Sequence, residues 1–395
     1  MSERKPLRLL VLGLISTLLS LVVAEGLVRL TALDIRLVQP ALYLVEDDMH
    51  YEDGAEAYQP SPRAGLLYEA IPSQTVTCAH CTHPMEDRYS SVPLSTNTLG
   101  LRGPEHGGDK PPGVRRIVVL GGSNIWAATV HNGDTPTAQT QRRLDEAAPG
   151  RFEVWNAGLN ANVMSQKVAR AEEFIDQYAP DLLVFQHHNQ GRRAFFHGDE
   201  DPARHFTLDP DLYLENIPSL LAPGDHPAAR RPRALRRSAL YRAVRAAGLR
   251  IAIWRHVASC ENEDPRHLGC ADAITGPLNV AADALAYQRW LAFLDRNPTL
   301  PILVVDPVFE VWCPDRPPNA PGPGSDTFLS GPRPDRPNLE YVSLCWGDRP
   351  PEYRDIHPPS YVYEEYGVQL AGHVWHTLGG PAPQSPPRNP ATAPQ

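Results

Sequence analysis

The sequence predicts an α/β protein in which helices cover both faces of a mainly parallel central sheet, a three-layer α/β/α arrangement. From Arg115 onwards, short apolar runs typical of buried strands alternate with segments whose apolar residues recur at helical spacing. Strands separated by helices are joined by right-handed crossovers and therefore lie parallel in one sheet. The 395 residues suffice for one large domain with insertions or for two small domains.

The elements follow one another in a regular order. Buried-strand runs occupy 115–120, 152–158, 180–189 and 300–309, and helical patterns occupy 135–150, 165–180 and 360–380. Pro136 suits the first turn of the first helix, and Gly150 follows its end. Pro180 stops the second helix, and glycines end the last one.

The first 30 residues predict a membrane segment. Arg4, Lys5 and Arg8 precede an uncharged apolar run at 9–24, a charge pattern that orients the amino end towards the cytoplasm. Residues 26–30 extend the run towards a full span, which favours an uncleaved signal-anchor. Cleavage after Ala24 as a signal peptide is the alternative. Both alternatives place the remaining chain outside the cytoplasm, on the periplasmic or extracellular side.

The remaining chain divides into three parts. Residues 31–110 form an irregular lead-in segment, with short extended pieces expected at 66–72 and 97–105. Residues 111–380 form the α/β domain, which an insertion at 191–276 interrupts. The proline-rich tail at 381–395 cannot build a core and is expected to be disordered.

The insertion contains a basic helical pattern at 230–256, whose apolar spacing is only loosely amphipathic. One interpretation is a solvated helix that packs over the domain. The other is a basic surface that faces anionic lipid or an acidic glycan. The sequence leaves both open.

Charge and cysteine content restrict the possible functions. The net charge of −9 favours no nucleic-acid partner. The chain carries no P-loop or dinucleotide fingerprint, and we expect no cofactor.

The chain has six cysteines, and an even number in an exported chain predicts disulfides. Cys78 and Cys81, with His80 and His83, also have metal-ligand spacing, but a single C-x-x-C is too unspecific to assign a metal site. The oligomeric state is not predicted.

Glycine and polar residues follow the predicted strands at their carboxyl ends, where ligands bind in open parallel sheets. These stretches are Gly-Gly-Ser-Asn at 121–124, Asn-Ala-Gly at 156–158, His-His-Asn-Gln at 187–190 and, before the last helix, Asp-Ile-His-Pro at 355–358. Plainer structural roles are the alternative: Ser123, for example, could be a helix N-cap after a glycine turn.

In order and spacing, the four stretches resemble the four blocks of the SGNH (GDSL-like) hydrolases. The resemblance covers 115–195 and 300–378, and 97–105 resembles the lead-in of membrane-anchored, exported members. It implies a flavodoxin-like α/β/α fold. The residues that give the family its name would be Ser123, Gly158, Asn189 and His357.

The resemblance also implies a mechanism. Ser123 would be the nucleophile, and His357 the base that takes its proton. The oxyanion donors would be the backbone N–H groups of Ser123 and Gly158 and the side-chain amide of Asn189. A glycine at 158 permits close backbone approach, and an asparagine supplies an N–H₂ donor that a carboxylate lacks.

The chain departs from the family pattern at three places. Gly122 stands where the family has the Asp of Gly-Asp-Ser, which supports the turn. His187 stands where the third block usually has Gly, and Gln190 where it has an acid. Arg354 stands three residues before His357, where the family has the triad Asp, so we predict that Asp355 orients the imidazole instead. A Ser–His dyad, or a more distant carboxylate, is the alternative.

The expected function is an exported serine ester hydrolase, of carboxylesterase or O-deacetylase type, held in the membrane by its N-terminal helix. Its substrate would be an acylated glycan, a lipid or a small ester. Two alternatives remain: an O-acyltransferase of the cell envelope and a non-catalytic glycan-binding relative.

Overall fold

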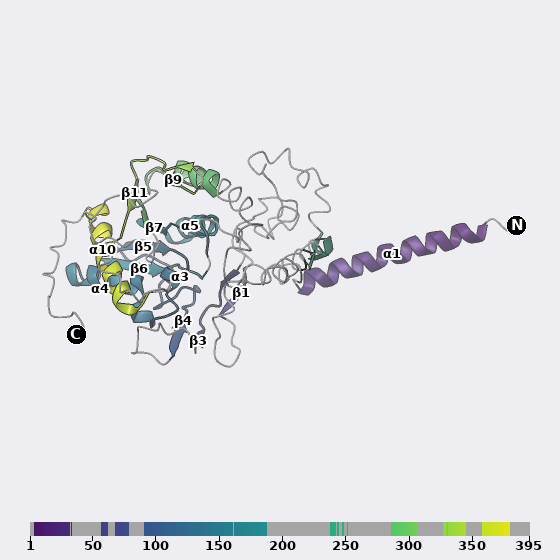
Figure 1. Ribbon diagram of the computed structural model, residues 1–395, viewed down its shortest axis with the longest axis horizontal. Helices are drawn as coiled ribbons and strands as arrows, with labels where there is room; N and C mark the ends of the chain where they lie inside the picture. Colours follow the sequence, from purple (N-terminus) through teal and green to yellow (C-terminus); the bar gives the residue numbers. More distant parts are fainter. Residues whose placement is uncertain are drawn as a thin grey trace, which may run out of the picture.

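The computed structural model of the chain describes residues 4–31, 33, 57–61, 68–78, 91–160, 162–187, 238–241, 243–244, 247–248, 251, 286–305, 327–329, 331–344 and 358–379. Within these residues a parallel sheet lies between layers of helices, and a long N-terminal helix stands apart from them (Figure 1). The predicted α/β/α class is confirmed.

The central sheet has five strands, and every neighbouring pair is parallel. The strands are β5 (Arg115–Leu120), β6 (Phe152–Asn156), β7 (Leu182–Gln186), β8 (Ile302–Val305) and β11 (Leu339–Val342). Their spatial order is β11-β8-β7-β5-β6. Numbered along the chain this is the flavodoxin-like order 2-1-3-4-5, so the order reverses between β5 and β7. Ligands of such sheets bind beyond the carboxyl ends at this reversal, directly after Leu120 and Gln186.

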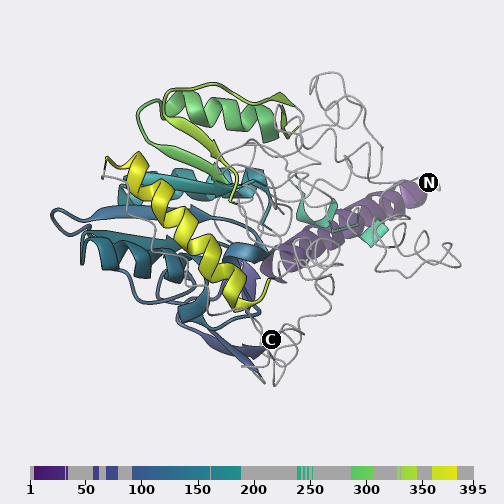
Figure 2. The same ribbon diagram turned by 60° about the vertical axis from the view of Figure 1, so that its left-hand side comes forward.

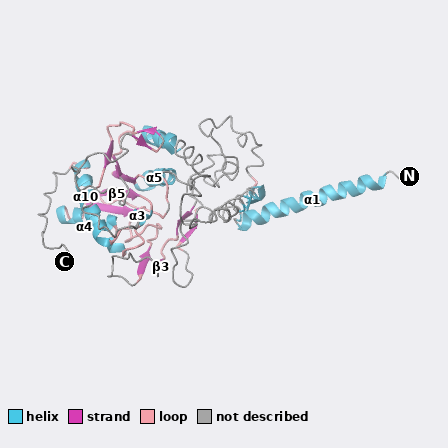
Figure 3. Ribbon diagram, in the orientation of Figure 1, coloured by secondary structure: helices cyan, strands magenta, loops and turns pink. Residues whose placement is uncertain are grey.

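Within the described residues, helices cover both faces of the sheet (Figures 2 and 3). On one face lie α4 (Pro136–Ala147) and α10 (Ser360–Thr377), which is the yellow helix of Figure 2. On the other face lie α5 (Met164–Tyr178) and the helical residues 286–296.

The alternation of side chains along β5 accounts for the two-sided core. Ile117 and Val119 pack in the cluster that contains α4 and α10, whereas Val118 and Leu120 pack in the cluster that contains α5. All four side chains are fully buried. A strand buried on both faces must be apolar throughout, and this explains why the run was recognisable in the sequence.

The start of α4 is set by its own residues. Thr135 is the N-cap, and its hydroxyl accepts a hydrogen bond from the N–H of Ala138 at 3.2 Å. Pro136 is the first helical residue, where a missing N–H costs nothing. Gly150 follows the helix with φ +67°, a left-handed conformation suited to glycine.

The lead-in segment is more regular than predicted. It contains two antiparallel pairs: β1 (Tyr58–Pro60) with β2 (Tyr68–Ala70), and β3 (Thr75–Cys78) with β4 (Val92–Ser95). The extended piece expected at 66–72 includes β2. The piece expected at 97–105 contains no strand, and only Arg102 forms isolated bridges there, with Thr96 and Asn156.

Several other elements were not predicted. Besides β11 and the helical residues 286–296, they are α3 (Ser123–Trp126), η2 (Asn132–Asp134) and the short pair β9 (Thr327–Phe328) and β10 (Gly331–Pro332). The tail at 381–395 and most of the insertion at 191–276 lie outside the described residues.

The N-terminal helix α1 (Arg4–Thr31) confirms the predicted apolar segment. Within the described part of the chain, it alone is long and apolar enough to cross a membrane, over Val11–Thr31. Most of its apolar side chains are exposed, as a helix surrounded by lipid requires. The helix is compatible with a membrane anchor and equally with a signal sequence.

Candidate functional site

Ser123 lies at the carboxyl edge of the sheet, at the start of a single buried helical turn. After β5 the chain passes through Gly121 and Gly122 and enters α3 (Ser123–Trp126). The N–H of Trp126 donates to the carbonyl of Gly122 at 3.0 Å and closes the turn. Gly122, not Ser123, is the N-cap, and α3 has no side-chain cap hydrogen bond. The N-cap interpretation of Ser123 is therefore wrong.

The Ser123 side chain has no structural task among the described residues. It is partly exposed, whereas the other three residues of α3 are buried. None of the described residues forms a hydrogen bond with its hydroxyl. Within the described part of the chain, the Ser123 hydroxyl therefore remains available for chemistry.

The glycines around this turn are required by close packing. A Cβ on Gly121 would lie 2.0 Å from Cγ1 of Ile125, and a Cβ on Gly158 would lie 2.6 Å from the N of Trp126. No larger residue fits at either position without a shift of the turn. The structure thus brings the Ser123 and Gly158 stretches into direct contact, and Gly158 is more than an ordinary turn glycine.

Asn156, at the end of β6, links these two stretches. Its Nδ2 donates to the carbonyl of Ile125 at 2.8 Å, and its Oδ1 accepts the N–H of Gly158 at 3.0 Å. The second bond occupies the donor that the resemblance assigns to the oxyanion. The sequence pattern places Asn156 at the strand end but indicates no role for it.

Gln186, at the end of β7, supports the turn from the other side. Its Oε1 accepts the N–H of Gly122 at 2.9 Å. The same oxygen lies 3.0 Å from the position that a Cβ on Gly121 would take. Gln186 is buried, and its Nε2 has no hydrogen-bond partner in the described part of the chain. Because β5 and β7 flank the reversal of strand order, this contact lies where the fold places ligands.

A buried lysine lies behind Gln186. Lys167 of α5 is fully buried, and its Nζ donates to the backbone carbonyl of Gln186 at 2.8 Å. Burial lowers the pKa of Lys167 to about 7, because the ammonium loses its hydration. The helical pattern at 165–180 was predicted, but nothing in it distinguishes Lys167 from a lysine on a solvated face.

His187 follows Gln186 and packs against an aromatic ring. Its imidazole lies 4.8 Å from the ring centre of Phe328. Burial lowers the pKa of His187 to about 4, and the positive charges of Lys167 and Arg333 add to the effect. The ring is therefore neutral at pH 7, and His187 directly follows Gln186, which supports the Ser123 turn.

Three predicted site residues, Asn189, Asp355 and His357, lie outside the described residues. The chain is described again from Pro358, directly after His357. The Thr129 hydroxyl donates to the carbonyl of Pro358 at 3.2 Å, and Thr129 belongs to the loop that follows α3. Tyr363, at the start of α10, packs with Ala127 of the same loop. The residue next to His357 is therefore held against the segment that Ser123 begins.

The lead-in segment also holds this loop. The guanidinium of Arg102 donates to the backbone carbonyls of Trp126, Ala127 and Val130. Its Nε donates to Oδ1 of Asn132 at 2.9 Å. Arg102 is buried although it is charged, and its burial is tolerated because its guanidinium donates to several oxygen acceptors and lies 5.8 Å from the ring centre of Trp126.

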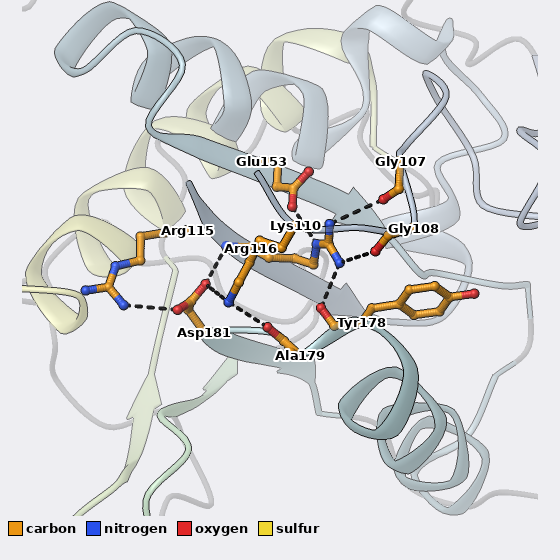
Figure 4. Close-up of polar contacts among 9 residues, drawn as sticks. All are labelled: Gly107, Gly108, Lys110, Arg115, Arg116, Glu153, Tyr178, Ala179 and Asp181. Carbon is orange, nitrogen blue, oxygen red and sulfur yellow. Dashed lines mark hydrogen bonds and ion pairs between the residues drawn. The ribbon is translucent and has the colours of Figure 1, made fainter. Parts of the chain in front are cut away.

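At the amino ends of the strands, opposite Ser123, lies an ionic cluster with no sign of catalysis (Figure 4). Arg116 is completely buried and donates to Glu153 at 2.5 Å and to the carbonyl of Tyr178 at 2.7 Å. Asp181 accepts from Lys110 at 2.9 Å and from Arg115 at 3.0 Å. These residues lie at the amino ends of β5 and β7, away from Ser123, and every charge is paired. We assign the cluster to stability.

His373 of α10 is partly buried and faces the edge strand of the sheet. Nδ1 of His373 lies 3.7 Å from Oε1 of Glu340 on β11. A hydrogen bond from His373 is the largest of the effects that lower the pKa of Glu340. This contact ties the helix to the edge strand and is remote from the turn at Ser123.

No protein-family model matches this chain, and comparison with curated proteins finds no match. The class of protein is accordingly defined by fold and site: a three-layer α/β protein with flavodoxin-like strand order and a serine turn at its topological switch point.

Proposed function

We propose that the protein is a serine ester hydrolase of carboxylesterase or O-deacetylase type, which acts through an acyl-enzyme on Ser123. One observation carries the proposal. Ser123 begins a helical turn at the switch point of the sheet, the residue is partly exposed, and its hydroxyl has no hydrogen-bond partner among the described residues. The resemblance to SGNH hydrolases supplies the remaining roles.

The proposed reaction has two halves. The Ser123 oxygen attacks the ester carbonyl while His357 accepts the serine proton, and the tetrahedral intermediate collapses as His357 returns that proton to the leaving alcohol. Water then attacks the acyl-serine in the same manner, releases the carboxylic acid and restores the serine. Asp355 orients the imidazole and stabilises its charged form.

The contact between Thr129 and Pro358 supports this assignment of the base. It holds the neighbour of His357 against the loop after α3, at the same end of the sheet as Ser123. The contact between Gln186 and Gly122 supports the role of Asn189 in the same way, because Asn189 follows Gln186 by three residues.

The two proposed backbone donors to the oxyanion differ in whether their N–H group is already hydrogen-bonded. In the first turn of a helix backbone N–H groups lack helical acceptors, and the N–H of Ser123 is in that position. The N–H of Gly158 donates to Asn156, so it contributes only if it shares or leaves that bond. The proposal therefore places most of the oxyanion stabilisation on Ser123 and Asn189.

The proposed location is a membrane anchor with the catalytic domain outside the cytoplasm. The length of α1 supports an anchor. Cys78, at the end of β3, is fully buried and disulfide-bonded, which supports an oxidising compartment. Acylated glycans, lipids and small esters remain the proposed substrates, without a nucleic-acid partner.

A fluorophosphonate probe tests the proposal. It reacts with activated serines, and we expect one adduct per chain, on the peptide that contains Ser123. Ser123→Ala, shown by thermal unfolding to be folded, should take up no probe. If the wild-type protein stays unlabelled under conditions that label a known serine hydrolase, the proposal is wrong.

The hydrogen bond from Gly158 to Asn156 favours a second candidate, a non-catalytic glycan-binding relative. This candidate predicts that Ser123→Ala leaves the cellular phenotype unchanged, whereas the esterase predicts its loss. An O-acyltransferase shares the acyl-enzyme and differs in the acceptor. Transfer of a labelled acyl group to a sugar hydroxyl in preference to water would identify it.

A further inference from the structure

The carboxyl end of α1 is bound to a second helix from the insertion. Glu25 of α1 accepts hydrogen bonds from the Ser238 hydroxyl at 2.7 Å and from the N–H groups of Ala239 at 2.9 Å and Leu240 at 2.8 Å. Residues 239–241, 243–244, 247–248 and 251 are helical. The Glu25 carboxylate thus satisfies the free N–H groups at the start of this helix, where negative charge is also favourable.

Apolar packing continues the contact. Val28, one turn after Glu25, is buried against Ala239 and Ala243, and Leu240 packs beside them. Small side chains on the second helix permit this close approach. In Figures 1 and 2 the second helix, drawn in teal, accordingly lies beside the end of α1.

This contact sets the level of the second helix relative to a membrane. The 21 residues of Val11–Thr31 measure about 30 Å as a helix, the thickness of a bilayer core. Glu25 lies about 9 Å from the Thr31 end along the axis. If α1 spans the bilayer, a helix held by Glu25 and Val28 lies within about 10 Å of the end of the span, the depth to which interfacial helices bury their apolar face.

The composition of the second helix suits that boundary. Val244 and Ile251 are both helical and are 62% and 52% exposed. They are seven positions apart in the sequence, the spacing of residues on one helix face. The surrounding sequence contains arginine and neither Asp nor Glu over 230–255. The arginines are Arg230, Arg231, Arg233, Arg236, Arg237, Arg242, Arg245, Arg250 and Arg255. Exposed aliphatic side chains within an arginine-rich stretch of sequence are typical of segments that lie on anionic bilayers.

We infer that the helix between Ser238 and Ile251 is an interfacial helix. It docks on α1 through Glu25 and inserts Val244 and Ile251 into the surface of an anionic phospholipid bilayer. The occupant is lipid and not an acidic glycan, because a glycan would leave the two aliphatic side chains in water. This inference rests on the proposed membrane anchor and is independent of the chemistry proposed for Ser123.

Spin-label accessibility in nanodiscs tests the inference on the full chain. A ketone-bearing amino acid, placed singly at Val244 or Ile251, carries the label and leaves the six cysteines untouched. The same label at Leu18 in α1 is the immersed control, and at Glu146 on α4 the aqueous control. Oxygen concentrates in the bilayer, whereas a water-soluble nickel chelate stays outside it. In nanodiscs with phosphatidylglycerol, we therefore expect oxygen to relax the labels at Val244 and Ile251 more than the nickel chelate does. The label at Leu18 should show the same order.

Two comparisons sharpen the test. In nanodiscs of phosphatidylcholine alone, the labels at Val244 and Ile251 should be less immersed. Glu25→Leu removes the carboxylate that accepts the hydrogen bonds of Ser238, Ala239 and Leu240, and it should reduce the immersion of both labels in either lipid. The inference is overturned if both labels match Glu146 while Leu18 is immersed. It is also overturned if the labels stay in water and only an acidic polysaccharide immobilises them. Equal immersion in the two lipids would overturn the assignment of anionic lipid.

Discussion

The Oε1 atom of Gln186 lies 2.9 Å from the backbone N of Gly122 and accepts its hydrogen bond. The bond joins the end of β7 to the turn of Ser123 across the point where the strand order reverses. The proposed resemblance to SGNH hydrolases would place the turn-supporting aspartate of that family at the position of Gly122. In this protein Gln186, on the neighbouring strand β7, supplies the acceptor for the N–H of Gly122. Nζ of Lys167 donates in turn to the backbone carbonyl of Gln186.

Replacement of Gln186 by methionine should loosen the turn. Gln186→Met preserves the volume but leaves a buried N–H unpaired, at a cost of about 1–3 kcal/mol. We expect fluorophosphonate labelling of Ser123 to slow by roughly tenfold and amide exchange at Gly122 to accelerate. Gln186→Glu keeps the acceptor and should label faster than the methionine variant. Unchanged exchange at Gly122 in Gln186→Met would show that the bond is unimportant.

Gly158→Ala tests the contact between the two glycine-containing stretches. The added Cβ would lie 2.6 Å from the N of Trp126, so the turn must shift, and we expect a loss of about 1–3 kcal/mol in the free energy of unfolding. Gly133→Ala is the matched control, because nothing lies within 4 Å of its Cβ position. Chemical denaturation measures both variants. Equal stability of the two would refute the packing account.

The buried Arg116 should matter far more than its exposed neighbour. Arg116→Met removes a fully buried charge and leaves Glu153 without its partner, which typically costs about 3–5 kcal/mol. The side chain of Arg115 is 56% exposed, so Arg115→Met should cost less than about 1 kcal/mol although it also loses an ion pair. Urea denaturation of the two variants decides. If the two variants lose similar free energies of unfolding, burial does not determine how much each arginine contributes to stability.

His106 should make the fold sensitive to acid. Its ring stacks on Trp155 with centres 4.8 Å apart. Burial lowers the pKa of His106 to about 4; the charge of Arg116 adds to this effect, and Glu105 opposes it. Between pH 6.5 and pH 4 the unfolded chain therefore binds more protons at this residue, and stability falls as the pH falls through that window.

His106→Phe keeps the stacked ring and removes the titration. We expect the variant to match the wild type at pH 7.5 and to exceed its stability at pH 5 by about 2 kcal/mol. Denaturation curves at the two pH values provide the measurement. A stability difference that does not depend on pH would contradict the proton-linkage account.

Much of the fold was predictable because its strands are buried on both faces. The apolar runs of β5, β7 and β8 can belong only to a central sheet or a buried helix, and their length favours strands. The strand β11 was missed because its four residues, Leu-Glu-Tyr-Val, include a charge and lie at the edge of the sheet.

The site was predictable in part. The approach of Gly158 to the Ser123 turn followed from the order of the strands. The roles of Gln186 and Arg102 did not, because each depends on a contact with a residue 24 or more positions away. Local pattern contains no signal for such contacts. Asn189, Asp355 and His357 lie outside the described residues, and their roles stay predictions.

The central claim is that Ser123 forms an acyl-enzyme, and turnover of p-nitrophenyl acetate by the full chain tests it most directly. We predict measurable turnover by the wild type, none above background for Ser123→Ala, and a reduced rate for Asp355→Asn, with thermal unfolding unchanged in both variants. Wild-type turnover by a folded Ser123→Ala variant would contradict the account.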